Sequence, residues 1–220
     1  GAYMNPVVSL DIMAHEFTHL VTSQNGNGGL DYLNESGALN EAIADCMSVA
    51  ADMYINKEKA NWQIADGVTG NGIPNMRDLS NPKMSGGGIF NSATLSYPQP
   101  DTYQGENWVD PSNMNYDNGG IHFNNGVFNY WFYLLTEGGS GVNDNNQSYE
   151  VEGIGIQKTE KLLMHIILNY LTLYSVSVYI GAVFKLLCLS DIYTNRSVEL
   201  KRLATCGNFG VAKHNANFFA

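Results

Sequence analysis

Apolar residues recur with a helical period along the first part of the chain. Between residues 6 and 24 they occupy positions 7, 8, 10, 12, 13, 17, 20 and 21. This spacing is typical of an α-helix. Because the apolar positions surround the helix almost completely, the pattern predicts that residues 6–24 form a buried helix. The glycine-rich run 25–29 is expected to end it.

The same period returns further along the chain. Helices are predicted over residues 36–57, 123–136 and 157–171, with one or two more within 179–206. Ser36 is the expected N-cap of the first of these helices, and Gly138 with Gly139 should end the second.

Between these helices, residues 66–120 are rich in Gly, Asn, Pro, Ser and Asp and are predicted to be mainly loop. A loop region of this length inside a compact domain is usually functional or stabilised by ions. No repeat and no linker divides the sequence. We therefore expect residues 1–220 to form one mainly helical domain.

One apolar stretch, residues 162–184, has no Asp, Glu, Lys or Arg and is long enough to cross a bilayer. It also contains His165, Asn169, Thr172 and several tyrosines. These polar groups favour buried helices, broken near residues 172–178, over a membrane span. A membrane-anchored protein that uses this stretch is the alternative.

Composition narrows the class of protein. The net charge is -10 and no block of basic residues is present, which argues against a nucleic-acid partner. Abundant Gly, Asn and Tyr with few Lys and Arg fit a secreted enzyme. The three cysteines, Cys46, Cys188 and Cys206, include no CxxC pair, which excludes a disulfide framework and a thiolate zinc cluster. One bridge between Cys188 and Cys206 and three free thiols are both compatible with the sequence.

The motif HEFTH, residues 15–19, carries the first candidate chemistry. On a helix, His15 and His19 lie one turn apart on one face, so both imidazoles can reach a single ion, and imidazole nitrogen suits Zn2+. Glu16 is rotated by about 100° from His15. There it could take a proton from metal-activated water, which is why HExxH indicates a metalloprotease. So short a motif also occurs by chance.

A catalytic zinc needs a third protein ligand. Glu41 and Asp45 lie one turn apart within an otherwise apolar predicted helix. We predict that Glu41 is the third ligand and that Asp45 accepts a hydrogen bond from a ligand imidazole. The alternative is a solvated helix face, but buried carboxylates need a partner or a metal.

Four motifs, taken in order, resemble those of the thermolysin-family zinc metalloendopeptidases. They are HEFTH at 15–19, NESGALNEAIAD at 34–45, MRDLSNP at 76–82 and DNGGIH at 117–122. The resemblance is strongest over residues 8–170 and fades over 171–220. It implies a mainly α fold: the helical C-terminal domain of such a neutral metalloprotease, with long loops. The family's N-terminal β-rich half, the other wall of its substrate cleft, would be missing.

The resemblance implies the same zinc ligands and the same general base, and it adds Asn40, which with Asp45 would orient the ligand histidines. It also implies roles around the reacting carbonyl. His122 would stabilise the oxyanion of the tetrahedral intermediate, and Asp117 would hold its other nitrogen. Tyr32 would act at the same oxygen, and Arg77 would bind a backbone carbonyl of the substrate. Donors aimed at developing negative charge are what acyl transfer requires.

Calcium is a further expectation from the resemblance. The family's carboxylate ligands fall on Asp11, Asp52 and Asp66, whereas Asn61 and Gln63 stand where more acidic residues would be expected. Fewer carboxylates predict one Ca2+ ion instead of two, with carbonyls of Asn61 or Gln63 completing the site.

The resulting hypothesis is a secreted zinc endopeptidase that cleaves peptides or proteins before bulky apolar residues by means of metal-activated water. The alternative is a zinc-binding remnant with little or no peptidase activity that acts as an interaction domain. The two differ in whether a partner, such as the β-rich half, completes the cleft. A membrane association is not expected.

Overall fold

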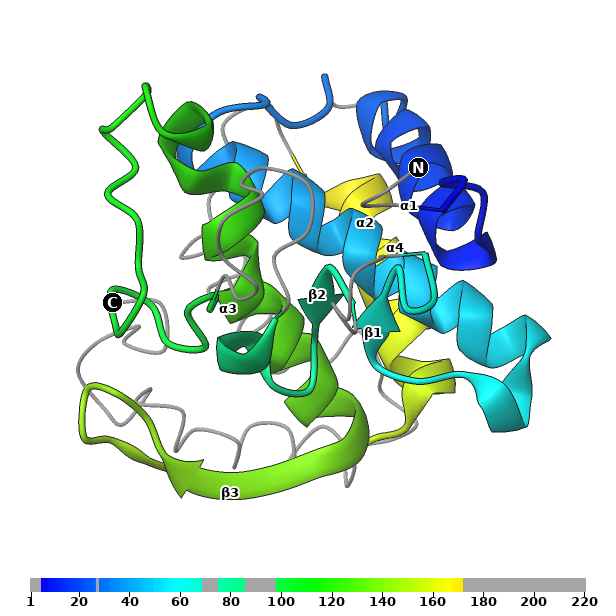
Figure 1. Cartoon of the computed structure of the whole chain (residues 1–220). Coiled ribbons are helices and arrows are strands. Elements are labelled where there is room, and N and C mark those ends of the chain that lie inside the picture. The colour runs from blue at the N-terminus through cyan, green and yellow to red at the C-terminus, as the bar shows by residue number, and fades with distance from the viewer. Residues whose placement is uncertain (1–4, 27, 69–74, 86–97, 172–220) are drawn as a thin grey trace.

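The computed structural model describes residues 5–26, 28–68, 75–85 and 98–171, and four α-helices dominate this part of the chain. They are α1 (Leu10–Ser23), α2 (Asn34–Ile55), α3 (Asp117–Glu137) and α4 (Ile156–Asn169). Helix α2 runs through the middle, with α1 on one side and α3 on the other (Figure 1). Helix α4 packs against both α2 and α3. The prediction of a mainly helical fold is therefore confirmed.

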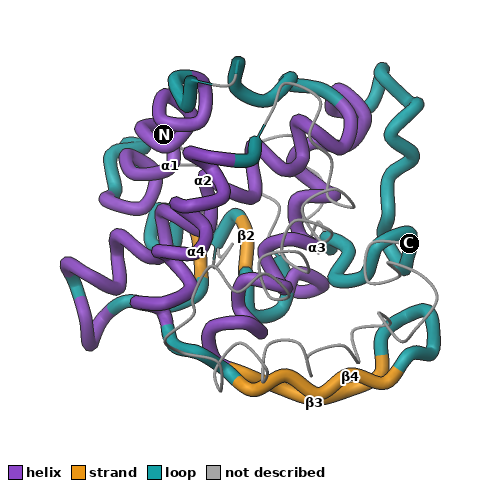
Figure 2. The backbone as a smooth tube through the Cα atoms, turned by 180° about the vertical axis from the view of Figure 1, so that it is seen from behind, coloured by secondary structure: helices purple, strands orange, loops and turns teal. Residues whose placement is uncertain are grey.

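Short elements connect the helices. Two short 3-10 turns follow α2: η1 (Lys57–Lys59) comes directly after it, and η2 (Pro82–Met84) lies within the loop region 66–120. Strands β1 (Gln63–Ile64) and β2 (Arg77–Asp78) pair antiparallel, as do β3 (Gly138–Val142) and β4 (Ser148–Glu152). The β3–β4 hairpin lies along one end of the molecule, beyond the ends of the helices (Figure 2).

The hydrophobic core lies between α2, α3 and α4. Ile43 of α2, Phe128 and Phe132 of α3, and Ile166 of α4 are all almost completely buried. Gly37 allows α2 to approach α3 closely, because a Cβ atom there would lie 2.6 Å from the side chain of Ile121. This close crossing brings the first turns of α2 and α3 together beside α1.

Helix α1 departs from its prediction in both length and burial. It begins at Leu10 instead of residue 6, and it is not buried all round. Met13, Phe17 and Leu20 have 61%, 65% and 61% of their surface exposed. The inward face carries mainly polar residues, which the apolar pattern could not reveal; they are Asp11, His15, Thr18 and Thr22.

The predicted cap of the second helix is also wrong. Helix α2 begins at Asn34, and Ser36 is buried within its first turn. The residue before the helix, Leu33, has an extended backbone and makes no side-chain cap. The backbone itself closes the first turn, through a 2.9 Å hydrogen bond from the amide of Gly37 to the carbonyl of Leu33.

Helix α3 is assigned from Asp117, but residues 117–120 have positive φ, so its right-handed part begins near Ile121, two residues before the predicted start. The hairpin after the helix was not predicted. The helix ends at Glu137, and Gly138 follows with a φ of 84°, as expected. Gly138 then pairs with Glu152 at the base of the hairpin. The β3 sequence GGSGV shows no alternation of apolar and polar residues, so it gives no strand signal.

Helix α4 agrees with its prediction within two residues and ends at Asn169. No helix in the described ranges is long and apolar enough to cross a membrane. The rest of the apolar stretch, residues 172–184, lies outside the described residues, as do the helices predicted within 179–206, Cys188 and Cys206. Cys46 is a free, buried thiol.

Candidate metal centre

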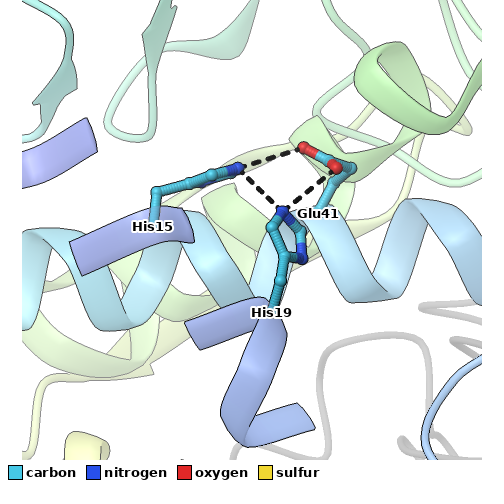
Figure 3. Close-up of side chains that lie close together, drawn as sticks. All are labelled: His15, His19 and Glu41. Atoms are coloured by element: carbon cyan, nitrogen blue, oxygen red, sulfur yellow. Dashed lines mark hydrogen bonds and ion pairs between the residues drawn. The ribbon is translucent and has the colours of Figure 1, made fainter. Parts of the chain in front are cut away.

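The two histidines of HEFTH meet at their ring nitrogens. His15 and His19 project from successive turns of α1 toward α2, and their Nε2 atoms lie 3.1 Å apart (Figure 3). The rings are nearly perpendicular, with centroids 4.7 Å apart. His15 is buried and His19 is partly buried. The helical spacing of four residues therefore places both imidazoles as the sequence predicts.

Glu41 of α2 completes a group of three. Its Oε2 lies 3.4 Å from Nε2 of His15, and its Oε1 lies 3.4 Å from Nε2 of His19. The carboxylate is almost fully buried. Within the described ranges, these are the residues that form a group of three or more His, Cys, Asp or Glu able to hold a metal ion.

The outer nitrogens of both rings face hydrogen-bond acceptors. Nδ1 of His15 lies 2.9 Å from Oδ1 of Asp45, and Nδ1 of His19 lies 2.8 Å from Oδ1 of Asn40. An acceptor at Nδ1 favours the tautomer with its proton there, which leaves a lone pair on each Nε2. These are the positions that the resemblance gives to Asn40 and Asp45.

The centre consequently gathers mainly acceptors, and in the described part of the chain the Tyr32 hydroxyl donates to one of them, Oε1 of Glu41. Two imidazole nitrogens and two carboxylate oxygens converge, and the buried carboxylate of Glu41 lies 3.4 Å from Nε2 of both His15 and His19. Such a cluster needs a positive charge. Nitrogen and oxygen donors in this number suit a zinc ion, with imidazoles held by outer acceptors, so the residues present fit the metal.

The pKa shifts of the clustered groups point the same way. Burial disfavours the charged imidazolium, but hydrogen bonds to Asp45 and Glu41 outweigh that effect and raise the pKa of His15 to about 9. Burial likewise opposes ionisation of Glu41, yet the hydrogen bond from His15 and the charges of His122 and Arg77 lower its pKa to about 2. The raised pKa of His15 and the lowered pKa of Glu41 both show that this group of side chains favours positive charge.

Asp45 lies at the base of the centre and accepts several hydrogen bonds. The guanidinium of Arg77 binds it through two bonds of 2.7 Å, from Nε to Oδ2 and from Nη2 to Oδ1. Asn125 and Asn129, one turn apart on α3, donate to Oδ2 at 2.9 and 2.8 Å. Burial would raise the pKa of Asp45, but the charge of Arg77 holds it well below its usual range.

Sequence reasoning missed the two asparagines. Their only signal is a pair of polar residues at helical spacing on a face of α3 that is otherwise apolar. The structure also gives Arg77 a partner that was not predicted, because its buried guanidinium binds Asp45. Its predicted contact with a substrate carbonyl stays a prediction.

His122 stands on the far side of Glu41. Its Nε2 lies 3.5 Å from Oε2 of Glu41 and 3.4 Å from the hydroxyl of Tyr32. The Tyr32 hydroxyl also donates to Oε1 of Glu41. Burial and the charge of Glu41 raise the pKa of Tyr32 well above its usual value, so it remains a neutral donor. The structure thus brings Tyr32 and His122 to the cluster.

A left-handed turn explains the DNGGIH motif. Residues 117–120 all have positive φ, and a Cβ atom on Gly119 would lie 2.5 Å from the carbonyl oxygen of Pro111. The turn folds Asp117 back onto the helix. Its Oδ2 accepts a hydrogen bond from the backbone amide of His122 at 2.7 Å. Its Oδ1 lies 2.7 Å from Nδ1 of the same histidine. Asp117 therefore fixes both the backbone and the ring of His122.

Glu16 is exposed, on the face of α1 beside the two histidines. Its role as the general base stays a prediction. A catalytic base with access to water is compatible with that position.

The calcium residues are not brought together. In the described part of the chain, Asp11, Asp52 and Asp66 do not form a group able to hold an ion. The carboxylate of Asp11 is buried and accepts the backbone amides of Ile12 and Ala65. Asp52 binds Asn56, and Asp66, which is exposed, binds Asn61 at 2.8 Å. Each carboxylate is satisfied locally, so the predicted ion stays a prediction.

Fold and centre together define a helical metal-binding domain of the metallopeptidase class. Comparison with known families gives the particular one: the family described as thermolysin metallopeptidase, α-helical domain, matches residues 28–203. The chain belongs to the thermolysin metallopeptidase family.

Similar proteins include a thermolysin from Alicyclobacillus acidocaldarius, 33% identical over 165 residues, which are 74% of this chain and 26% of that protein. A bacillolysin from Brevibacillus brevis is 34% identical over 168 residues, 76% of this chain and 26% of that protein. The chain thus spans about a quarter of the length of these relatives.

Among solved structures, the precursor of protealysin, a metalloproteinase from Serratia proteamaculans, is similar with a TM-score of 0.63. The alignment has 24% identity and covers 83% of this chain and 52% of that one. This likeness supports the fold.

Proposed function

We propose that the chain is the zinc-binding helical part of a secreted metalloendopeptidase that hydrolyses peptide bonds. The observation that carries the proposal is the convergence of His15, His19 and Glu41, whose ring nitrogens and carboxylate oxygens lie close enough to hold a single ion. Zinc would supply a Lewis acid that polarises water and the substrate carbonyl.

The chain's own residues would then handle the protons. Glu16, at the solvent-facing edge of α1, accepts a proton from the attacking water and delivers it to the leaving amine. Asp117 binds the backbone amide and the ring Nδ1 of His122, and the ring then donates to the oxyanion from Nε2. Tyr32 supplies a second donor beside it. Bulky apolar residues after the cut are the proposed preference, as the family resemblance implies.

A second candidate is a zinc-binding interaction domain without peptidase activity. It is favoured by the exposure of Glu16 together with its neighbours Met13 and Phe17. Catalysis gains about 7–11 kcal/mol from holding substrate in place, which an exposed Glu16 alone does not provide. A β-rich partner half that covers this side would restore the cleft.

One assay separates the two candidates. Zinc-loaded protein is incubated with quenched fluorescent peptides that differ only in a Leu or an Asp at the position after the cut. We expect cleavage of the Leu peptide, and loss of cleavage in Glu16→Ala with zinc binding retained. Cleavage that survives Glu16→Ala would exclude the mechanism. Stoichiometric zinc without cleavage of either peptide would favour the interaction domain.

A single calcium ion near Asp11 is a further proposal. It is tested by melting the zinc-loaded protein with calcium and with a calcium-selective chelator. A higher melting temperature with calcium supports the ion, and identical curves exclude it.

A further inference from the structure

A buried chain of side-chain amides connects the long loop to the metal centre. Gln99 lies in the loop before α3 and is 3% exposed. Its Nε2 donates to the backbone carbonyl of His122 at 2.6 Å and to Oδ1 of Asn125 at 2.7 Å. Asn125 in turn donates to Oδ2 of Asp45, whose Oδ1 holds the ring of His15. Hydrogen bonds thereby connect the loop, α3 and α2 to the ring of His15 on α1.

The hydrogen bonds of Gln99 fix the orientation of its amide. Both hydrogens of the NH2 group are used, and Oε1 accepts the hydroxyl of Ser85 at 3.0 Å. The reversed amide would place its carbonyl oxygen against two other acceptors. Every polar atom of this buried side chain has a partner. The network therefore has one arrangement, and it opposes movement of the loop relative to α3.

The backbone is shaped to admit this contact. Gly126 follows Asn125 on α3, and a Cβ atom there would lie 2.6 Å from the carbonyl oxygen of Pro100 and 2.7 Å from Cβ of Gln99. Any larger residue would push the loop away from the helix. The loop therefore rests on α3 at the turn that carries His122.

The metal ligands stand on α1 and α2, whereas His122 stands on α3. We infer that Gln99 and Asn125 are positioning residues that set where His122 lies relative to the metal centre. Gln99 donates a hydrogen bond to the backbone carbonyl of His122 and another to Asn125. Asn125 in turn donates to Asp45, which contacts His15. The role of the His122 imidazole in catalysis rests on the proposed function. Its placement by Gln99 and Asn125 does not.

The first test needs no turnover. The zinc-loaded full chain is labelled with 15N-histidine, and the ring signals of His122 are compared between wild type, Gln99→Met and Asn125→Leu. Both variants keep the side-chain size and remove the donors, and both should displace the His122 signals. Thr102→Val is the matched control, because Thr102 lies in the same loop, is equally buried and has a hydroxyl that bonds to Asp101 and Asp144. It should leave those signals in place.

The second test separates positioning from stability. In Gln99→Met we expect kcat to fall about tenfold, whereas KM and the zinc Kd should each change by less than about threefold. Residues that hydrogen-bond to the residues of a site typically contribute about 10–100-fold to activity or metal affinity. Gln99→Glu keeps the shape but sets a carboxylate against two acceptors, so its kcat should be lower still. Asn125→Leu should also weaken zinc about tenfold, through Asp45. In the double variant the losses should not multiply, because the two residues share one bond.

The outcomes are distinguishable. Unchanged His122 signals in Gln99→Met, or equal displacement in Thr102→Val, would overturn the inference. If Gln99→Met fails to fold, Asn125→Leu carries the same spectroscopic comparison. Displaced His122 signals in Gln99→Met, together with a wild-type protein that cleaves no peptide, would support the positioning role and reject the proposed peptidase activity.

Discussion

The two helices that supply the metal centre are buried in opposite ways. Helix α2 is enclosed along most of its length, and Leu39, Ile43 and Val49 are each at most 1% exposed. Helix α1 buries one stripe and turns Met13 and Phe17 to solvent. Glu41 on α2 thus has a rigid support, whereas His15 and His19 on α1 do not.

Different interactions hold the two helices. Apolar packing on α3 and α4 holds α2. Helix α1 is held largely by polar contacts: its Asp11 carbonyl accepts the hydroxyl of Ser48 at 2.6 Å, and its histidines bind Asp45 and Asn40. Polar contacts contribute less net stability than apolar burial of similar size. We therefore expect α1 to respond to changes at the metal centre more than α2.

The largest effect is expected from Asp45→Asn. The change leaves the buried charge of Arg77 without its partner, which should cost about 3–5 kcal/mol in the free energy of unfolding. It should also weaken zinc binding about 10–100-fold. Urea unfolding of the metal-free variant and a competition assay for zinc measure the two effects. Glu41→Gln is the control: it should abolish zinc binding with a smaller loss of metal-free stability. Equal losses would contradict a structural role for Asp45.

Removal of zinc is expected to have the next largest effect. At free zinc about 1,000 times the Kd, binding stabilises the folded state by about 4 kcal/mol. Chelation should remove this stability and increase amide hydrogen exchange in α1, which carries two ligands on a weakly held helix. Exchange in the middle of α2 should change little. A uniform increase over both helices would show that they form one cooperative unit and remove the contrast.

A smaller effect is expected at the contact between the two helices. Ser48→Ala removes the hydroxyl that binds the carbonyl of Asp11, and should lower the free energy of unfolding by about 0.5–1.5 kcal/mol. Ser23→Ala is the matched control, because the Ser23 hydroxyl is exposed and binds within α1. Urea curves of both variants measure the difference. Equal stability of the two would mean that this contact does not hold α1.

The contrast between α1 and α2 also explains where sequence reasoning succeeded. The positions of His15 and His19 follow from helical spacing alone, and Glu41 from a carboxylate on an apolar helix, so this cluster was predictable. The burial of α1 was not, because its inward stripe is selected for hydrogen bonding and metal chemistry instead of hydrophobicity. The apolar pattern there marks the outward face.

Residues that act through distant contacts were the ones missed. Asn125 and Asn129 lie 80 and 84 residues from Asp45, and Gln99 lies 23 residues from His122 in a loop without periodicity. No local pattern reports such pairs. Asp117 was found only because the family motif includes it, although its role follows from the glycine turn that folds it back onto His122. The sequence therefore indicated residues that belong to a recognisable motif and missed partners that only the fold brings together.

The smallest effect is expected from Phe17→Ser on the outward face of α1. With 65% of its surface exposed, Phe17 should contribute within about 0.5 kcal/mol to the free energy of unfolding. Phe132→Ala is the comparison, because it removes a fully buried ring and should cost about 3–5 kcal/mol. Thermal melting is combined with sedimentation velocity, since exposed apolar patches promote association. If Phe17→Ser destabilises the protein by more than about 1 kcal/mol and dissociates an oligomer, this face is covered in solution. The unequal burial of α1 and α2 would then hold only for the isolated chain.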